Sequence, residues 1–431
     1  MESAWGKKEL RSESGLLGFG SSKKRRVKET GEKMGQGKRA VIWKGSSMTL
    51  EQQLERAVSY AEETGSFHKR NLIEQADHVC VYGLGKYFED AFIRQDVRKR
   101  FHVDLLCDGN FEKVKTVVSK EEYGGLTGIS IDGLKQMNKV FVIVMLGNPT
   151  DALRQIGGAV GVENCAAYND VALDDVVSRE EKYTQTTYFQ EQKADIFKAF
   201  HLMGDDRSRE IYVNVICNRI APQFAAMSYE QMYQEPQYFP EDVLSLTEQE
   251  CIVDGGAYTG DTLESFLQIR GKQFAAYHGF EMDYENYEKL RQKCETMEDS
   301  VREKICCHHK GLWDTEETLT YGRRASDDSY SIYNREDAAT AETVSLDAYL
   351  GKEKITLIKM DIEGAEWKAL QGARETIKSQ KPKMAVCVYH RLEDIWKIPL
   401  FLKELVPEYK IALRHHARYW VSETVCYACA E

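Results

Sequence analysis

Long apolar segments are missing from this chain of 431 residues. No run approaches the roughly eighteen consecutive apolar residues that a membrane-spanning helix needs, so we expect no membrane span. The N-terminus carries charges and glycines but no apolar stretch of the kind that forms a secretory signal. The 11 cysteines are scattered and form no disulfide framework. These absences predict reduced thiols and a cytoplasmic location.

The common hydrolase and metal motifs are missing as well. Neither G-x-S-x-G nor H-E-x-x-H occurs, which excludes the commonest hydrolase signatures. The run Cys306 to His309 resembles a metal cluster, but neighbours on a strand point to opposite faces, so these four cannot meet one ion. The pair Cys426 and Cys429 has no second pair to complete a zinc site. We therefore predict no metal site.

Positive charge is scarce outside the N-terminus. Residues 1–46 contain 12 Lys/Arg against 5 Asp/Glu, whereas the remainder contains 46 against 64. An acidic body argues against a nucleic-acid substrate, because phosphate binding requires a basic surface. We expect residues 1–47 to form a basic, disordered tail. This tail is either an RNA-binding arm or the product of an upstream start, with Met48 as the natural initiator, and we favour the second explanation.

The most informative segment is a glycine-rich turn between residues 251 and 262. A short apolar run ends in Asp254, glycines follow at 255, 256 and 260, and a helical pattern begins at Thr262. This order is typical of the first strand, turn and helix of a nucleotide-binding α/β sheet. The spacing is not G-x-G-x-x-G, and no P-loop lysine is present. An acidic residue before the turn suits a cationic ligand such as S-adenosylmethionine better than a pyrophosphate.

Two further predicted strands end in carboxylates. The apolar segment 274–280 leads to Glu281, which lies in the window where an acidic residue binds ribose hydroxyls in Rossmann-like sheets. The segment 355–360 leads to Asp361 and Glu363, and a single helix is predicted from there to about Ile377. Helix capping is the alternative role for Asp361. Ligands bind at the carboxyl ends of strands in open α/β sheets, so these carboxylates are candidate site residues.

The C-terminal blocks complete the pattern. A strand at 384–389 is followed by His390, and the segments 409–413 and 423–429 form a predicted antiparallel hairpin. The blocks VDGGAYTGDT, GFEMDYENYEKL, IKMDIEGAEWKALQGA and PKMAVCVYH, with a late RHH, closely resemble FkbM-type methyltransferases. The resemblance covers about residues 235–431, and its four blocks occur in the expected order.

This resemblance implies a Rossmann-like class I methyltransferase sheet, mostly parallel, that uses S-adenosylmethionine. It implies O-methylation of a sugar, a glycan or a related polyhydroxylated small molecule. Carried over by position, Glu281 holds the ribose, Met282 lies beside the adenine, and Asp361 and Glu363 lie near the methyl group. The loop that holds the methionine part of the cofactor comprises Asp254, Gly255, Gly256, Ala257, Tyr258, Thr259, Gly260, Asp261 and Thr262.

A poor nucleophile such as a sugar hydroxyl needs a base as its proton leaves. The candidates at the predicted strand ends are Asp361, Glu363 and His390, of which histidine has the ordinary pKa nearest neutrality. The pair His415 and His416 is a candidate for the substrate mouth.

The chain is too long for one such domain. Strands at 78–82, 103–107 and 140–145 predict a second, N-terminal Rossmann-like α/β domain at 48–180. A helical connector at 181–240 and the methyltransferase domain at 241–431 follow. For Tyr238 and Phe239 at the end of the connector, core packing is favoured over cofactor contact.

The N-terminal domain leaves rival functions open. Its turn Gly83-Leu84-Gly85 is an incomplete dinucleotide fingerprint. One alternative function is therefore that of an NAD(P)-dependent oxidoreductase or a nucleotide-sugar-binding protein acting through this domain. A second alternative is a non-catalytic scaffold. Assembly into a homo-oligomer is also left open by the sequence.

Overall fold

The computed structural model describes residues 48–64, 68–177, 187–323, 330–331, 339–351 and 353–430. The predicted basic tail at 1–47 lies outside these residues. Among the helices in the described ranges, none is both long and apolar enough to cross a membrane.

The N-terminal part contains a five-stranded parallel sheet in the order β3-β2-β1-β4-β5. Its central strands are buried because β1 and β4 are almost entirely apolar. This sheet confirms the second parallel α/β sheet predicted for the N-terminal part. The strands are β1 (His78–Tyr82), β2 (Leu105–Cys107), β3 (Thr127–Ile129), β4 (Val140–Val144) and β5 (Cys165–Ala167).

Helices precede, separate and follow these strands in the sequence. They are α2 (His68–Gln75), α3 (Lys86–Ala91), α4 (Val97–Arg100), α5 (Phe111–Val118), α6 (Ile131–Leu134), α7 (Thr150–Val160) and α8 (Tyr168–Val177). After β1 the chain turns at Gly83, whose φ is +95°. Leu84 N then donates to Asp108 Oδ2 at 2.8 Å, so the residue at the end of β2 holds the glycine turn itself.

A helical layer follows, made of α9 (Tyr188–Leu202), α10 (Asp206–Ile220) and α11 (Tyr229–Met232). The early helix α1 (Leu50–Thr64) has the amphipathic spacing expected from Leu50 onward. Its buried residues share one hydrophobic core with α9, α10 and the C-terminal sheet. The sequence range predicted for the N-terminal domain thus contributes a helix to the core of the C-terminal part.

The C-terminal sheet has seven strands in the order β15-β16-β14-β13-β6-β7-β8. All neighbouring pairs are parallel except those made by β16, which runs antiparallel to both β14 and β15. The predicted hairpin is therefore present, with its second strand inserted inside the sheet. The strands are β6 (Cys251–Gly255), β7 (Ala276–Phe280), β8 (Ile305–His308), β13 (Leu357–Met360), β14 (Lys383–Cys387), β15 (Lys410–His415) and β16 (Thr424–Cys429).

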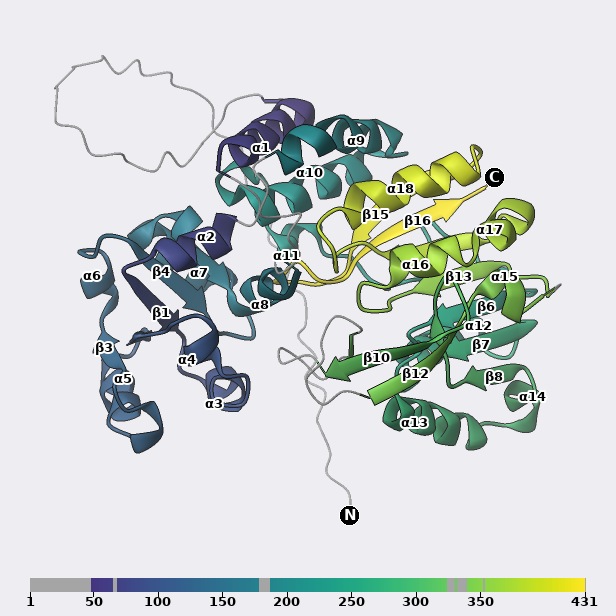
Figure 1. The fold of residues 1–431 in the computed structure, drawn as a ribbon, viewed down its shortest axis with the longest axis horizontal. Helices are drawn as coiled ribbons and strands as arrows, with labels where there is room; N and C mark the ends of the chain where they lie inside the picture. Colours follow the sequence, from purple (N-terminus) through teal and green to yellow (C-terminus); the bar gives the residue numbers. More distant parts are fainter. Residues whose placement is uncertain are drawn as a thin grey trace, which may run out of the picture. The chain divides into compact units, whose positions relative to one another are not determined.

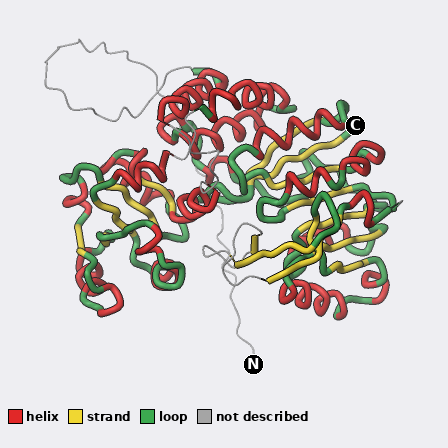
Figure 2. Tube along the Cα trace, viewed as in Figure 1, coloured by secondary structure: helices red, strands yellow, loops and turns green. Residues whose placement is uncertain are grey.

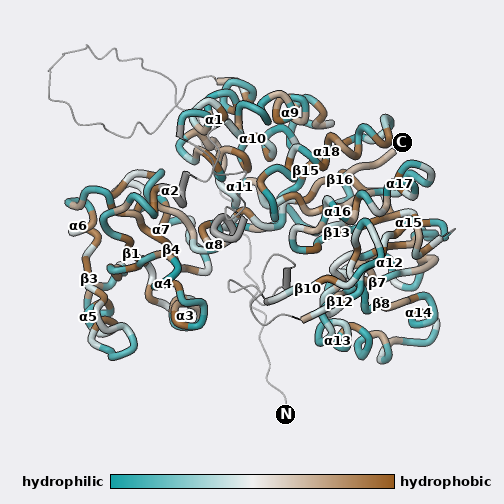
Figure 3. Tube along the Cα trace, viewed as in Figure 1, coloured by the Kyte–Doolittle hydropathy of each residue, from teal (hydrophilic) through white to brown (hydrophobic). Residues whose placement is uncertain are grey.

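Helices cover both faces of this sheet, as the ribbon and the tube show (Figure 1, Figure 2). One face packs on α12 (Asp261–Arg270) and α13 (Tyr284–Glu295), with the short α14 (Asp299–Arg302) beyond them. The other packs on α16 (Glu366–Gln371), α17 (Arg374–Gln380) and α18 (Asp394–Leu405). Figure 3 shows apolar colouring along α18, which buries eight of its 12 residues. This architecture confirms the predicted methyltransferase-type α/β sheet.

Two features differ from the sequence prediction. A four-stranded sheet, in the order β11-β10-β12-β9, is inserted between β8 and β13 and was not expected. The single helix predicted up to Ile377 is two helices: Gly372 O accepts from Asp347 N at 2.9 Å, and the Asp347 carboxylate accepts from Glu375 N and Thr376 N at the start of the second helix. The inserted elements are β9 (Gly311–Leu312), β10 (Thr318–Arg323), β11 (Tyr330–Ser331), β12 (Ala339–Val344) and the short helix α15 (Leu346–Tyr349).

Candidate active site

The glycine turn after β6 is shaped by its neighbour β13. Gly256 has φ +72°, and a Cβ on it would lie 1.9 Å from Asp361 O. Gly256 N and Ala257 N both donate to Phe280 O at 3.0 Å, which ties the turn to β7. The turn therefore requires glycine because another backbone approaches closely.

A buried ion pair between β13 and β6 stabilises the glycine turn that follows β6. Lys359 and Asp254 are in-register neighbours on β13 and β6, and Lys359 Nζ lies 2.8 Å from Asp254 Oδ1. The same ammonium donates to Gly255 O at 3.1 Å and to Gly256 O at 2.8 Å. Tyr277 donates its hydroxyl to the second oxygen of Asp254. Burial raises the pKa of Asp254 in spite of Lys359, so the ionised carboxylate depends on this ammonium.

Glu281 lies at the end of β7, as predicted. Its carboxylate accepts hydrogen bonds from Tyr258 N at 2.9 Å and from Asp283 N at 2.8 Å. Burial raises the pKa of Glu281 to about 7. Each carboxylate oxygen can accept more than one hydrogen bond, so both retain acceptor capacity toward a ligand.

Asp361 lies at the carboxyl end of β13, opposite the glycine turn. Its oxygens accept from Tyr238 Oη at 2.7 Å and from Tyr389 Oη at 3.1 Å. It does not cap the following helix, because Ala365 holds the N-cap position of α16. Glu363 follows in a left-handed conformation with φ +59°, an uncommon state for a residue with a Cβ.

His390 lies behind these carboxylates and is 1% exposed. Its Nδ1 is 2.9 Å from Glu366 Oε1, and its Nε2 is 3.4 Å from Glu363 Oε2 and 3.5 Å from Asp361 Oδ1. Burial alone lowers the pKa of a histidine, but Glu366 and Glu363 raise that of His390 well above its ordinary value. The prediction that His390 is the base remains untested, and a protonated imidazole counts against it.

These elements surround a cavity of about 340 Å³ at the carboxyl ends of β6, β7 and β13, a volume within the range of small-molecule sites. The predicted residues that line it are Gly256, Tyr258, Asp261, Thr262, Glu281, Met282, Asp361 and Glu363. The others support the turn or lie behind it and do not line this cavity: Asp254, Gly255, Ala257, Thr259, Gly260 and His390.

Several lining residues were not predicted. Tyr238, for which core packing was favoured, is buried and also lines the cavity. Lys359 lies in the block IKMDIEGAEWKALQGA, but no role was predicted for it from the sequence. The inserted sheet adds residues for which no sequence signal was recognised: Lys310, Gly311, Leu312, Trp313, Leu319 and Thr343.

His415 and His416 do not line this cavity, contrary to expectation. His415 Nδ1 is 2.9 Å from Thr424 Oγ1, and His416 Nε2 is 2.8 Å from Tyr427 Oη. Both rings are buried, and these contacts make them packing residues of the β15–β16 hairpin.

Metal-ligating side chains gather in three places within the described ranges. Two groups share Asp361, one with Glu366 and His390 and one with Cys387 and Glu423. The third, Cys251 with His278 and Glu353, lies apart from the cavity lining.

Comparisons with known proteins find a family domain in this part of the chain. Residues 254–414 match the model of the methyltransferase FkbM domain. No curated protein matches the chain.

Among solved structures, the methyltransferase FkbM from Methylobacillus flagellatus KT is similar to this chain over 88% of its residues and 99% of that chain. The TM-score is 0.63 at 20% identity, which shows a shared fold. An rRNA methylase from Streptococcus thermophilus is aligned with 42% of this chain and 87% of its own, at 12% identity and a TM-score of 0.28. Residues 254–414 of this protein thus match the methyltransferase FkbM domain, and the chain shares its fold with a solved FkbM methyltransferase.

Proposed function

We propose that this protein is an S-adenosylmethionine-dependent O-methyltransferase that methylates a hydroxyl of a sugar, a glycan or a related polyhydroxylated small molecule. The observation that carries the proposal is a cavity at the carboxyl ends of β6, β7 and β13. Carboxylates stand on both sides of it, with Glu281 at one side and Asp361 and Glu363 at the other.

The charge of the cavity favours a cationic cofactor. Four carboxylates line it: Asp261, Glu281, Asp361 and Glu363. Its two lysines already have partners, because Lys359 pairs with Asp254 and Lys310 pairs with Glu342. A sulfonium and an ammonium therefore enter a site with excess negative charge. When bound, S-adenosylmethionine supplies the activated methyl group.

Glu281 is the residue we assign to the ribose hydroxyls. Two backbone amides fix its carboxylate, so it accepts further hydrogen bonds without reorganising. Met282, next in the chain, lines the cavity where we assign the adenine.

Glu363 is the residue we assign to the proton of the acceptor hydroxyl. Asp361 already accepts from two tyrosine hydroxyls, which suits it to orient the acceptor. Glu363 lines the same cavity, with a quarter of its side chain exposed. A Glu363 carboxylate oxygen would accept the proton that the acceptor hydroxyl loses on methylation.

His390 is assigned a positioning role. The pKa of His390 is raised by Glu366 and Glu363, and the ring lies between their carboxylates, within 2.9 Å of Glu366 Oε1 and 3.4 Å of Glu363 Oε2. This assignment departs from the general-base role expected from the sequence.

Calorimetric titration tests the cofactor. We expect one S-adenosylmethionine per chain and no tight binding of NAD(H) or NADP(H), which separates the proposal from the oxidoreductase alternative. Glu281→Ala should weaken binding by about 1–3 kcal/mol, whereas the control Glu408→Ala, an exposed carboxylate outside the cavity lining, should leave it unchanged. Tight NAD binding without S-adenosylmethionine binding would overturn the proposal.

A screen of mono- and oligosaccharides with methyl-labelled cofactor tests the acceptor. We expect the labelled methyl group on a hydroxyl oxygen of a glycan, as an ether that is stable to base. Label confined to protein, nitrogen or carbon acceptors would refute the O-methyl assignment and leave the cofactor assignment standing.

A further inference from the structure

The third group of metal-ligating side chains lies on one face of the C-terminal sheet. His278 on β7 is in register with Cys306 on β8, so the two residues share a face. Cys251 on β6 is in register with Ala276 on β7, which lies two residues before His278. Side chains two residues apart on a strand point to the same face, so Cys251 shares the face of His278. Three adjacent strands thus direct a histidine and two cysteines toward one area.

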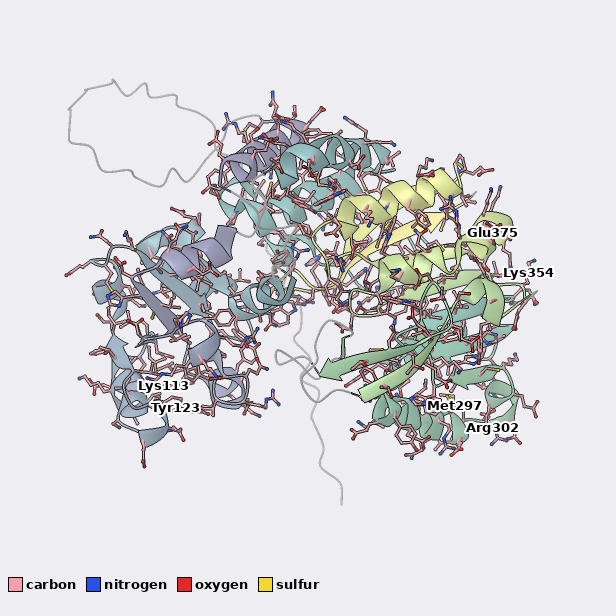
Figure 4. The ribbon with its side chains drawn as sticks, in the orientation of Figure 1. Lys113, Tyr123, Met297, Arg302, Lys354 and Glu375 are labelled. Carbon is pink, nitrogen blue, oxygen red and sulfur yellow. The ribbon has the colours of Figure 1, made fainter. Side chains whose placement is uncertain are left out.

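A carboxylate closes this area from outside the sheet. Glu353 lies in the loop between α15 and β13, beside Lys354, which Figure 4 labels. Glu353 Oε1 is 3.0 Å from His278 Nε2 and 4.0 Å from Cys251 Sγ. One ligand atom of each of the three residues lies within 4.8 Å of the other two.

We propose that Cys251, His278 and Glu353 form a binding site for a divalent transition metal of the zinc class, separate from the methyl-transfer site. Zinc bonds of about 2.0–2.3 Å to sulfur, nitrogen and oxygen need ligand atoms separated as these are, after small side-chain rotations. The combination of thiolate, imidazole and one carboxylate selects zinc-like ions and disfavours magnesium and calcium, which prefer oxygen ligands. Cys306, in register with His278, shares this face of the sheet but does not belong to the group of three.

A second histidine supplies the outer partner that metal-bound histidines usually have. His278 Nδ1 is 3.2 Å from His308 Nε2, and His308 Nδ1 is 3.3 Å from Tyr349 Oη. With a metal on His278 Nε2, the chain of hydrogen bonds runs outward, and His278 Nδ1–H donates to His308. Without a metal it runs inward, and His278 Nε2–H donates to Glu353. Either direction satisfies both rings, so His278 Nε2 can bind a metal through a change of tautomer in both histidines, without leaving a ring nitrogen unpaired.

The position of the site indicates a structural role. It joins β6 and β7, two strands that end at the cavity, to the loop that precedes β13. A bound ion therefore links elements far apart in the chain, and we expect it to raise the melting temperature of the full chain.

Cobalt(II) substitution tests the site, because cobalt–thiolate bonds absorb strongly in the near ultraviolet. The full chain is freed of metal with a chelator and titrated with cobalt chloride. We expect a thiolate charge-transfer band that saturates at one cobalt per chain and disappears when zinc is added. Cys251→Ser should abolish the band. The control is Cys387→Ser, since Cys387 belongs to the candidate group around Asp361.

Two further variants keep the test decisive if Cys251→Ser fails to fold. Glu353→Gln changes a partly exposed side chain and should weaken zinc binding. His308→Phe keeps an aromatic ring but removes the outer acceptor, which should cost about 10–100-fold in affinity. Absence of the band in the wild-type chain would overturn the proposal. So would a band lost in Cys387→Ser but kept in Cys251→Ser, or zinc affinity unchanged in both Glu353→Gln and His308→Phe.

Discussion

Replacement of Lys359 by methionine is the sharpest test of how the candidate site is held together. Lys359 is 2% exposed and Asp254 is fully buried, and their charged atoms are 2.8 Å apart. Methionine fills a similar volume but leaves the Asp254 carboxylate buried without a counter-charge. Breaking one side of a buried pair costs about 3–5 kcal/mol. The carbonyls of Gly255 and Gly256 lose a donor as well, so we expect a loss at the upper end of this range.

The assay is equilibrium urea unfolding followed by circular dichroism. The matched control is Lys381→Met, because Lys381 and Glu408 are also 2.8 Å apart but are both well exposed. Exposed pairs contribute little to stability, so this control should leave the unfolding midpoint nearly unchanged.

A double-mutant cycle isolates the pair itself. Asp254→Asn removes the charge that Lys359→Met leaves unpaired, so the double variant should be more stable than the sum of the single losses predicts. A loss for Lys359→Met no larger than that of Lys381→Met would refute the reasoning. Strict additivity in the cycle would also refute it.

The remaining predictions concern the turn, the cofactor and the proton. Gly256→Ala should destabilise the protein by about 1–3 kcal/mol more than Gly351→Ala, because both have positive φ but only Gly256 meets a backbone oxygen; equal losses in thermal unfolding would contradict this. Affinity for S-adenosylmethionine should rise as the pH increases through about 7, the pKa of Glu281, because the ionised carboxylate is the better acceptor. Glu281→Gln should remove this pH dependence of the affinity, as measured by calorimetry. Glu363→Gln should lower turnover by roughly 10²–10⁴ with cofactor affinity retained. His390→Gln should lower the limiting rate less than Glu363→Gln does, because it removes a group that lies 3.4 Å from Glu363 Oε2 and does not line the cavity. A larger loss of rate in His390→Gln than in Glu363→Gln would make His390 the base.

Much of the C-terminal fold followed from local sequence patterns. Apolar runs that end in Asp254, Glu281 and Asp361 predicted three strands of one parallel sheet, and the structure confirms them as β6, β7 and β13. These signals are local because each joins a buried strand to the turn that follows it. The inserted sheet β9–β12 was missed, although β10 alternates threonines with Leu319 and Tyr321, because β9 and β11 span only two residues each and give no local pattern.

The sequence by itself determined which residues stand at strand ends, because periodicity and turn chemistry act over a few neighbouring residues. Only the tertiary structure decided what those residues meet. Lys359 pairs with Asp254 because β13 lies beside β6, and Tyr238 reaches Asp361 across 123 positions of the chain. Sheet order also brings Cys251 to His278, although neither stands in a recognisable metal motif. Contacts between distant segments depend on how strands are ordered and packed, and no local pattern in one sequence encodes that order.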